Sequence, residues 1–384
     1  MRIYSPLDEE KIRTQAFVRD WHRSGFLDAS QALQIAAELR VDLRRTNFFL
    51  RAVLFLFTSV VIGAAVALIF ILIDVNVDVL NATVCIVAAA ACVRTSEFLI
   101  RNLRFYRFGV EEAFAVAAAV LLSIGIALVA PRARDFEFSV GLAVAAVGLV
   151  AIYLRYGYVY AAVAGIVCAA AVPLPLVRSA EVTRLLAAAV CTLAFFIVRR
   201  GRQARGDDFP GDDYGLIQAF AFAAIYVATN LQLTPDPYYK QDLIYWSTYA
   251  MTWVLPIIGF WLAVRSKDRP LMNVSVLSAL ITLVTNKSYL HLMRQPWDPV
   301  LLGLLLIIST ILTKRCLTNG TKGQRRGFTP ERMLASDRQA MNFVSTASAA
   351  FQPHSLQTPS APAKAVEPTF GGGRSGGAGA SGSF

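Results

Sequence analysis

Residues 51–73 read RAVLFLFTSVVIGAAVALIFILI, in which Arg51 is followed by 22 residues without a charge. A helix rises about 1.5 Å per residue, so about 20 apolar residues cross the roughly 30 Å of hydrocarbon in a bilayer. This stretch therefore predicts a transmembrane helix. The rest of the chain agrees, because 56% of the 384 residues are hydrophobic and only 16% are charged, where soluble domains carry about 25% charged residues.

Nine further apolar segments follow, and together they predict an all-α, polytopic transmembrane bundle of about ten spans over residues 49–315. Several segments are short for a straight crossing, and only residues 155–157 separate the fourth from the fifth, so nine or eleven spans stay open. The ten segments are 51–73, 76–93, 112–130, 138–154, 157–177, 182–198, 214–233, 244–264, 271–286 and 299–313.

Basic residues collect in alternate loops, as the positive-inside rule expects of cytosolic loops. The richer loops hold Arg94, Arg101, Arg104, Arg107, Arg155, Arg199, Arg200, Arg202, Arg205, Arg265, Lys267, Arg269, Lys314, Arg315, Lys322, Arg325 and Arg326. The poorer loops hold Arg132, Arg134, Arg178, Arg184, Lys240, Lys287 and Arg294. We therefore expect an inner-membrane protein with both termini in the cytosol and an even number of spans. The net charge of +11 is interpreted as loop charge rather than nucleic-acid binding.

The first 48 residues predict a small cytosolic helix pair rather than a signal peptide, because they carry repeated charges and no apolar core. The stretch SPLD at residues 5–8 is a helix start, and SG at residues 24–25 ends that helix. Asp28, with Gln31 three residues later, predicts a capping box for a second helix. Trp21 is expected to pack between the two helices.

The second predicted helix carries an apolar face. Its members recur at helical spacing and are Ala32, Leu33, Ala36, Leu39 and Leu43. Such a face packs against a partner helix or docks another protein, and we favour packing.

The stretch RDWHRSGFLD at residues 19–28, followed by the Gln31 helix and repeated apolar spans, resembles a bacterial family of predicted multi-pass membrane proteins of unknown function. That family typically opens with a cytosolic Trp-x-x-x-Gly-(Leu or Phe)-(Ile or Leu) helix pair, which here reads Trp-x-x-x-Gly-Phe-Leu from Trp21. The resemblance implies a fold and a membrane compartment. It brings no catalytic or binding residues with it.

Residues 316–384 lose the apolar periodicity and are rich in Gly, Ser, Pro and Ala. Such a composition buries too little apolar surface to offset its chain entropy, so a disordered cytosolic tail is expected. Its glycines follow no strand and open no helix, which rejects a phosphate-binding loop.

Candidate catalytic groups are few. The chain has three histidines and five cysteines, and the cysteines form no close C-x-x-C pair, so we expect no cofactor and no metal. The charged residues nearest the spans fall at predicted span ends, where we interpret them as solvated interface charges rather than an ion pathway. They are Asp74, Asp78, Glu111, Glu112 and Arg155.

The predicted outer loops carry the most site-like side chains. Aromatic rings beside cations and acids can bind a polar ligand such as a sugar or a lipid head group. They also suit an interfacial aromatic belt, which we favour. The candidate ligand-binding residues are Tyr245, Trp246, Trp253, His291, Arg294, Trp297 and Asp298.

Two functions remain open. The first is a non-enzymatic scaffold or regulatory partner that contacts the lipid bilayer and binds proteins through its N-terminal helix pair. The second is a transporter or a lipid- or glycan-handling protein, with a site near the outer ends of spans 5 and 8, which Pro173, Pro175 and Pro256 interrupt. A central cavity with converging polar groups would favour the second function.

Overall fold

The computed structural model describes residues 2–73, 78–131, 136–177, 179–205, 213–233, 242–290, 292, 295 and 297–318. Within these ranges the regular elements are all helical, which confirms the all-α prediction. They are α1 (Pro6–Arg23), α2 (Ala29–Glu38), α3 (Phe48–Ile73), α4 (Asp78–Leu103), α5 (Val110–Val129), α6 (Phe136–Tyr156), α7 (Val159–Ala171), α8 (Ala180–Arg205), α9 (Asp213–Thr229), the 3₁₀ helix η1 (Leu231–Leu233), α10 (Leu243–Ser266), α11 (Arg269–Tyr289) and α12 (Asp298–Thr318).

Six of these helices, namely α3, α4, α5, α6, α8 and α10, are long and apolar enough to cross a membrane. Apolar α7 and α9 are shorter, at 13 and 17 residues. Each of the ten apolar segments expected from the sequence overlaps one of the helices α3 to α12. The chain is therefore a multi-pass membrane protein, and most of the predicted tail, residues 319–384, lies outside the described residues.

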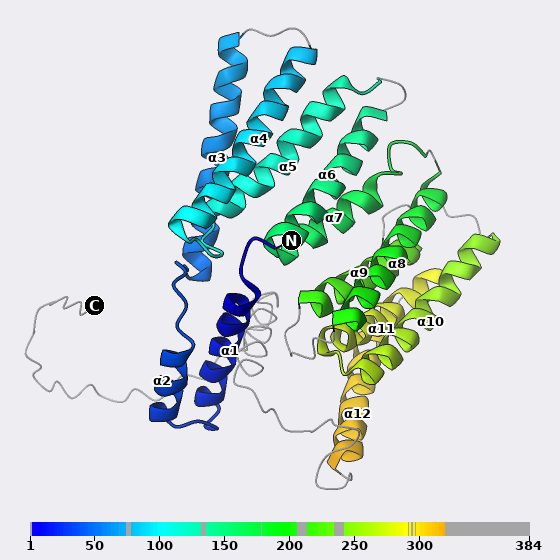
Figure 1. Ribbon diagram of the computed structural model, residues 1–384. Helices are drawn as coiled ribbons and strands as arrows, with labels where there is room; N and C mark the ends of the chain where they lie inside the picture. The colour runs from blue at the N-terminus through cyan, green and yellow to red at the C-terminus, as the bar shows by residue number, and fades with distance from the viewer. Residues whose placement is uncertain are drawn as a thin grey trace, which may run out of the picture.

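The helices pack mainly in chain order (Figure 1). Helices α3 to α7 stand side by side, with α5 between α4 and α6, and α8 to α11 form a second group. Helices α8 and α9 join the two groups, because both contact α7 of the first group, and α9 also contacts α10 and α11. Helix α12 projects away from the second group (Figure 1).

Small residues and local breaks explain this close packing. An added Cβ on Gly165 of α7 would lie 3.3 Å from the Ala146 carbonyl oxygen of α6, so the absence of a side chain at Gly165 lets the two helices pack closely. Between these helices the chain turns at Gly157, whose φ of +76° is a conformation that favours glycine.

Helices α1 and α2 lie below α3 and α5 in Figure 1, at the end of the bundle from which those two helices begin. Helix α1 ends before residues 24–25, and the Gln31 side chain accepts a hydrogen bond from the Asp28 backbone N–H at 3.2 Å, as a capping box requires. Trp21 stacks on Phe17 of its own helix and is 41% exposed. The expectation that the second helix encloses it is wrong, because two short helices offer too little surface.

Candidate functional site

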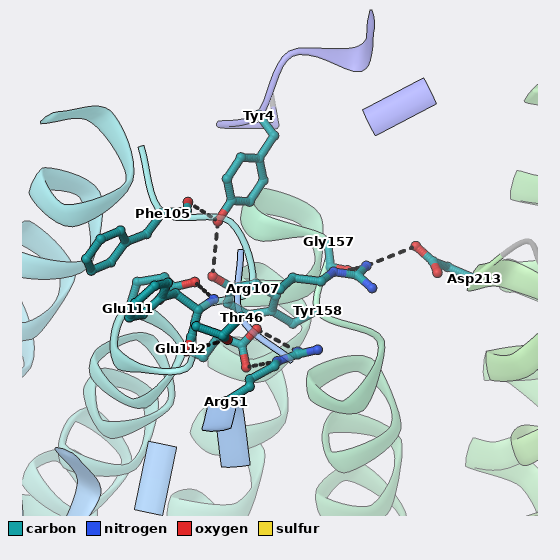
Figure 2. Close-up of polar contacts among 11 residues, drawn as sticks. Tyr4, Thr46, Arg51, Phe105, Arg107, Glu111, Glu112, Gly157, Tyr158 and Asp213 are labelled. Carbon is teal, nitrogen blue, oxygen red and sulfur yellow. Dashed lines mark hydrogen bonds and ion pairs between the residues drawn. The ribbon is translucent and has the colours of Figure 1, made fainter. Parts of the chain in front are cut away.

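Buried acidic and tyrosine side chains meet where α3 and α5 begin (Figure 2). They come from the N-terminal segment, the starts of α3, α5 and α9, the α4–α5 loop and the turn between α6 and α7. We call this set the acid–tyrosine cluster, and its members are Tyr4, Arg51, Arg107, Glu111, Glu112, Tyr158 and Asp213.

Glu112 is held by a two-pronged ion pair with Arg51. The Arg51 Nε lies 3.0 Å from Glu112 Oε2, and its Nη2 lies 2.6 Å from Oε1. The carboxylate is almost fully buried, and this guanidinium offsets part of the cost of removing it from water. Gly109 makes the approach possible: it has a φ of +109°, and a Cβ there would collide with the Arg51 carbonyl oxygen.

Glu111, the neighbouring acid, is fully buried and lacks a charged partner of this kind. Its Oε1 accepts a hydrogen bond at 2.6 Å from the backbone N–H of Phe108, which lies in the loop just before α5. Its Oε2 has no hydrogen-bond partner within the part of the chain that the structure describes. A buried oxygen without a hydrogen bond is costly. Glu112 Oε1 also makes no hydrogen bond among the described residues, but it lies 2.6 Å from the Arg51 guanidinium, which offsets its charge.

Tyr4 ties the N-terminal segment to this site. Its hydroxyl lies 3.4 Å from the Tyr158 hydroxyl and donates to the Phe105 carbonyl at 3.4 Å, while the Ile3 backbone N–H donates to the Arg155 carbonyl at 2.9 Å. Burial raises the pKa of both tyrosines, so each hydroxyl stays protonated at neutral pH. The pair therefore joins the two segments through neutral hydroxyls.

Asp213 connects the cluster to the second group of helices. The Arg107 guanidinium lies 3.9 Å from the Asp213 carboxylate and also donates to the Gly157 carbonyl at 3.4 Å. Arg13 of α1 approaches the same carboxylate at 3.5 Å. Ion pairs with Asp213 therefore connect the start of α9 to the α4–α5 loop and to α1.

The interpretation of the span-end charges as solvated is wrong for Glu111 and Glu112, which are both buried. Arg155 pairs with Glu97 at 2.8 Å. Asp74 lies outside the described residues. The sequence shows two adjacent carboxylates in the first turn of an apolar helix, shortly after Gly109, but it does not show that they are buried.

The predicted ligand-binding residues lie in different settings. Tyr245 is 2% exposed, and its hydroxyl donates to the Tyr289 carbonyl at 2.7 Å. Its ring meets those of Trp246 and Tyr289, and Tyr249 packs against both of these rings. The structure therefore gathers part of the aromatic set around Tyr245.

The other described members of that set are less buried than Tyr245. Trp246 and Trp253 are partly exposed, and Trp297 is 71% exposed. Asp298 forms an ion pair with Lys287. His291 and Arg294 lie outside the described residues. A role for the seven residues as one ligand site stays a prediction.

A second polar network, without charges, joins α9, α10 and α11. The Asn230 side chain donates to Tyr226 at 3.1 Å and to Thr285 at 3.2 Å, and Tyr226 pairs with Thr282 at 2.8 Å. Thr282 in turn donates to the Thr252 carbonyl of α10. The Asn230 amide thus bonds a neighbouring helix, as polar side chains in membrane bundles often do.

Comparisons with known proteins add no relative. No family model, curated protein or solved structure matches this chain. Among the described residues, no three His, Cys, Asp or Glu side chains are grouped so that they could hold a metal ion. The six long apolar helices nevertheless define the class, an integral membrane protein.

Proposed function

We propose that this protein is a non-enzymatic scaffold or regulatory partner of the bacterial inner membrane, with about ten spans and both termini in the cytosol. In this proposal, helices α1 and α2 form a docking unit for another protein. The observation that carries it is the contrast between the buried Tyr4 anchor and helix α2, which has no buried residue.

The anchor fixes the unit to the bundle. Tyr4 lies in an apolar cluster with Ile100, Leu149 and Tyr156, which come from α4 and α6. Glu9, at the start of α1, is buried and pairs with Arg2 at 2.8 Å. These contacts hold the docking unit in a defined position on the bundle. A unit that is already ordered loses less entropy when a partner binds.

The exposed part of the unit offers apolar contacts. Helix α2 has no buried residue, and Leu33 on it is 72% exposed. Phe26, in the turn between the helices, is 63% exposed. Single exposed apolar residues are ordinary on a protein surface. Here they share one short unit, and such grouping is typical of interaction surfaces.

The orientation rests on loop charge. The unit sits at the end of the bundle that also holds Arg104, Arg107 and Arg155, because Ile3 bonds the Arg155 carbonyl and Arg44 bonds the Arg104 carbonyl. Basic ends of spans face the cytosol in bacterial inner membranes. The same end would therefore present α1 and α2 to cytosolic proteins.

A matched pair of variants tests the docking role. Leu33→Glu places a charge on the exposed apolar position, and Gln34→Glu places the same charge on the adjacent exposed polar position. Chemical crosslinking in intact cells, followed by capture of the full-length protein, should recover a partner with wild type and Gln34→Glu and lose it with Leu33→Glu. Equal recovery by all three proteins would reject α2 as the docking surface.

The alternative function is a transporter or a lipid- or glycan-handling protein with a site near the outer ends of α7 and α10. The buried hydroxyl of Tyr245 and its ring contacts favour it, because they bring polar and aromatic groups together at the start of α10. Tyr245→Phe removes only the hydroxyl. Loss of ligand binding in that variant, with α2 variants unaffected, would place this alternative first.

A further inference from the structure

A groove of about 640 Å³ runs between α4 and α6 over α5. Its floor consists of the buried Ala115, Ala118 and Ala119 of α5, whose small side chains leave the space open. Ile86 and Val93 of α4 line one wall. Both walls pack against α5, so the groove is formed by three helices in contact with one another.

An ion pair between Arg155 and Glu97 spans one end of the groove. Arg155 of α6 reaches across to Glu97 of α4, with Nη2 2.8 Å and Nε 3.2 Å from the same carboxylate oxygen. Arg101 approaches the other oxygen of Glu97 at 3.4 Å, and Arg94 lies one turn earlier on α4. Two guanidinium groups contact one carboxylate and a third lies on the same helix nearby, so this end is net positive.

The groove has the length of one leaflet. Its lining on α4 extends from Ile86 to Glu97, which at about 1.5 Å per residue is about 16 Å. Half of a hydrocarbon core of about 30 Å is about 15 Å. The apolar lining therefore spans one leaflet, and the arginines lie where that leaflet has its head groups.

We propose that this groove binds one acyl chain of an anionic phospholipid, with the lipid phosphate beside Arg101 and Arg155. The charged bridge argues for a lipid rather than a transmembrane helix, because a helix would have to continue through the end that Arg155 and Glu97 close. A lipid ends at that level. Its phosphate complements the net positive charge, and guanidinium groups bind phosphate well. This site is independent of the α1–α2 docking unit.

The test uses purified full-length protein. The protein is reconstituted in vesicles of equal parts phosphatidylglycerol and phosphatidylcholine, extracted gently into detergent, and its bound lipids are counted by native mass spectrometry. The expected result is one retained phosphatidylglycerol per chain. Arg101→Gln should lower the preference for phosphatidylglycerol over phosphatidylcholine by about fivefold, since one basic side chain near the head groups is lost. Arg23→Gln, on the exposed end of α1, should leave it unchanged.

A second pair of variants tests the groove itself. Ala118→Phe fills the floor and should abolish retention of either lipid, whereas Ala67→Phe on the exposed side of α3 should retain phosphatidylglycerol as wild type does. If Ala118→Phe fails to fold, the lipid preference of Arg101→Gln relative to wild type still tests the proposal. Equal retention of the two lipids by wild type, or an unchanged preference in Arg101→Gln, would overturn the proposal. So would a protein dimer that Ala118→Phe dissociates, because a second copy would then fill the groove.

Discussion

The hydroxyl of Tyr4 lies 3.4 Å from the hydroxyl of Tyr158, which is 154 residues further along the chain. Both side chains are buried, and the contact joins the N-terminal segment to the turn between α6 and α7. The segment before α1 is therefore a structural part of the membrane bundle. Variants at this contact should affect the bundle as well as the helices that it carries.

Tyr4 should contribute more through packing than through its hydroxyl. Tyr4→Phe keeps the ring and should lower the free energy of unfolding by about 1 kcal/mol, the usual value of one hydrogen bond. Tyr4→Ala removes a buried aromatic side chain and should cost about 3–5 kcal/mol. The measurement is thermal unfolding in detergent, with trypsin cleavage within α1 as a second readout. Leu7→Ala, at an exposed position, is the control, and a Tyr4→Ala protein as stable as this control would contradict the packing account.

The two adjacent acids should respond in different ways to neutralisation. Glu112→Gln breaks the two-pronged pair with Arg51 and should destabilise the protein by about 1.5–3 kcal/mol. Glu111→Gln keeps an acceptor for the Phe108 N–H, and because the other oxygen of Glu111 has no hydrogen-bond partner among the described residues, the change should stay below about 1 kcal/mol. Thermal unfolding of both variants in the same detergent measures the difference. A larger loss of stability in Glu111→Gln than in Glu112→Gln would contradict the conclusion that Glu111 lacks an ion-pair partner like that of Glu112 among the described residues.

Glycines in α10 and α3 should differ sharply in their tolerance of alanine. A Cβ on Gly259 would collide with the Phe222 ring and lie 2.5 Å from the Ser275 Oγ, and both neighbours are buried. Gly259→Ala should therefore cost about 1–3 kcal/mol. Gly63 has no neighbour within 4 Å of such a Cβ. Gly63→Ala should leave stability unchanged or raise it by up to about 1 kcal/mol, because alanine favours helix. Equal losses in thermal unfolding would contradict this account of the α9–α11 core.

The orientation of the chain is tested by labelling single cysteines. In a background without the five native cysteines, a cysteine at Asp236 should react with a membrane-impermeant maleimide in intact cells. Cysteines next to Met1 and Phe384 should react only in inside-out vesicles. Labelling of the C-terminal cysteine in intact cells would reject an even number of spans with a cytosolic N-terminus.

Most of the fold could be predicted from the sequence because it depends on local properties. Long apolar segments form helices whichever neighbours they pack against. The turn at Gly157 follows from the conformational freedom of one glycine. The start of α5 with its two acids was visible too, but their burial was not. Whether Glu112 meets water or Arg51 depends on a contact across 61 residues, and spacing along the chain does not report such contacts.

The same reason limits prediction of the aromatic residues. Tyr245 and Trp246 are neighbours in sequence, yet one is buried against Tyr289 and the other is partly exposed. On a helix, adjacent residues point in different directions, so composition alone could not separate them. The groove over α5 was also not foreseen, because it is formed by the joint arrangement of three helices.

The central claim, that the N-terminal segment is part of the bundle, is tested most directly by photocrosslinking from residue 3. A benzophenone amino acid replaces Ile3, whose backbone N–H bonds the Arg155 carbonyl, and leaves Tyr4 intact. After irradiation of membranes, mass spectrometry should find the adduct within the same chain, in residues 153–160. Adducts only to lipid or to other proteins, with none in residues 153–160, would contradict the claim.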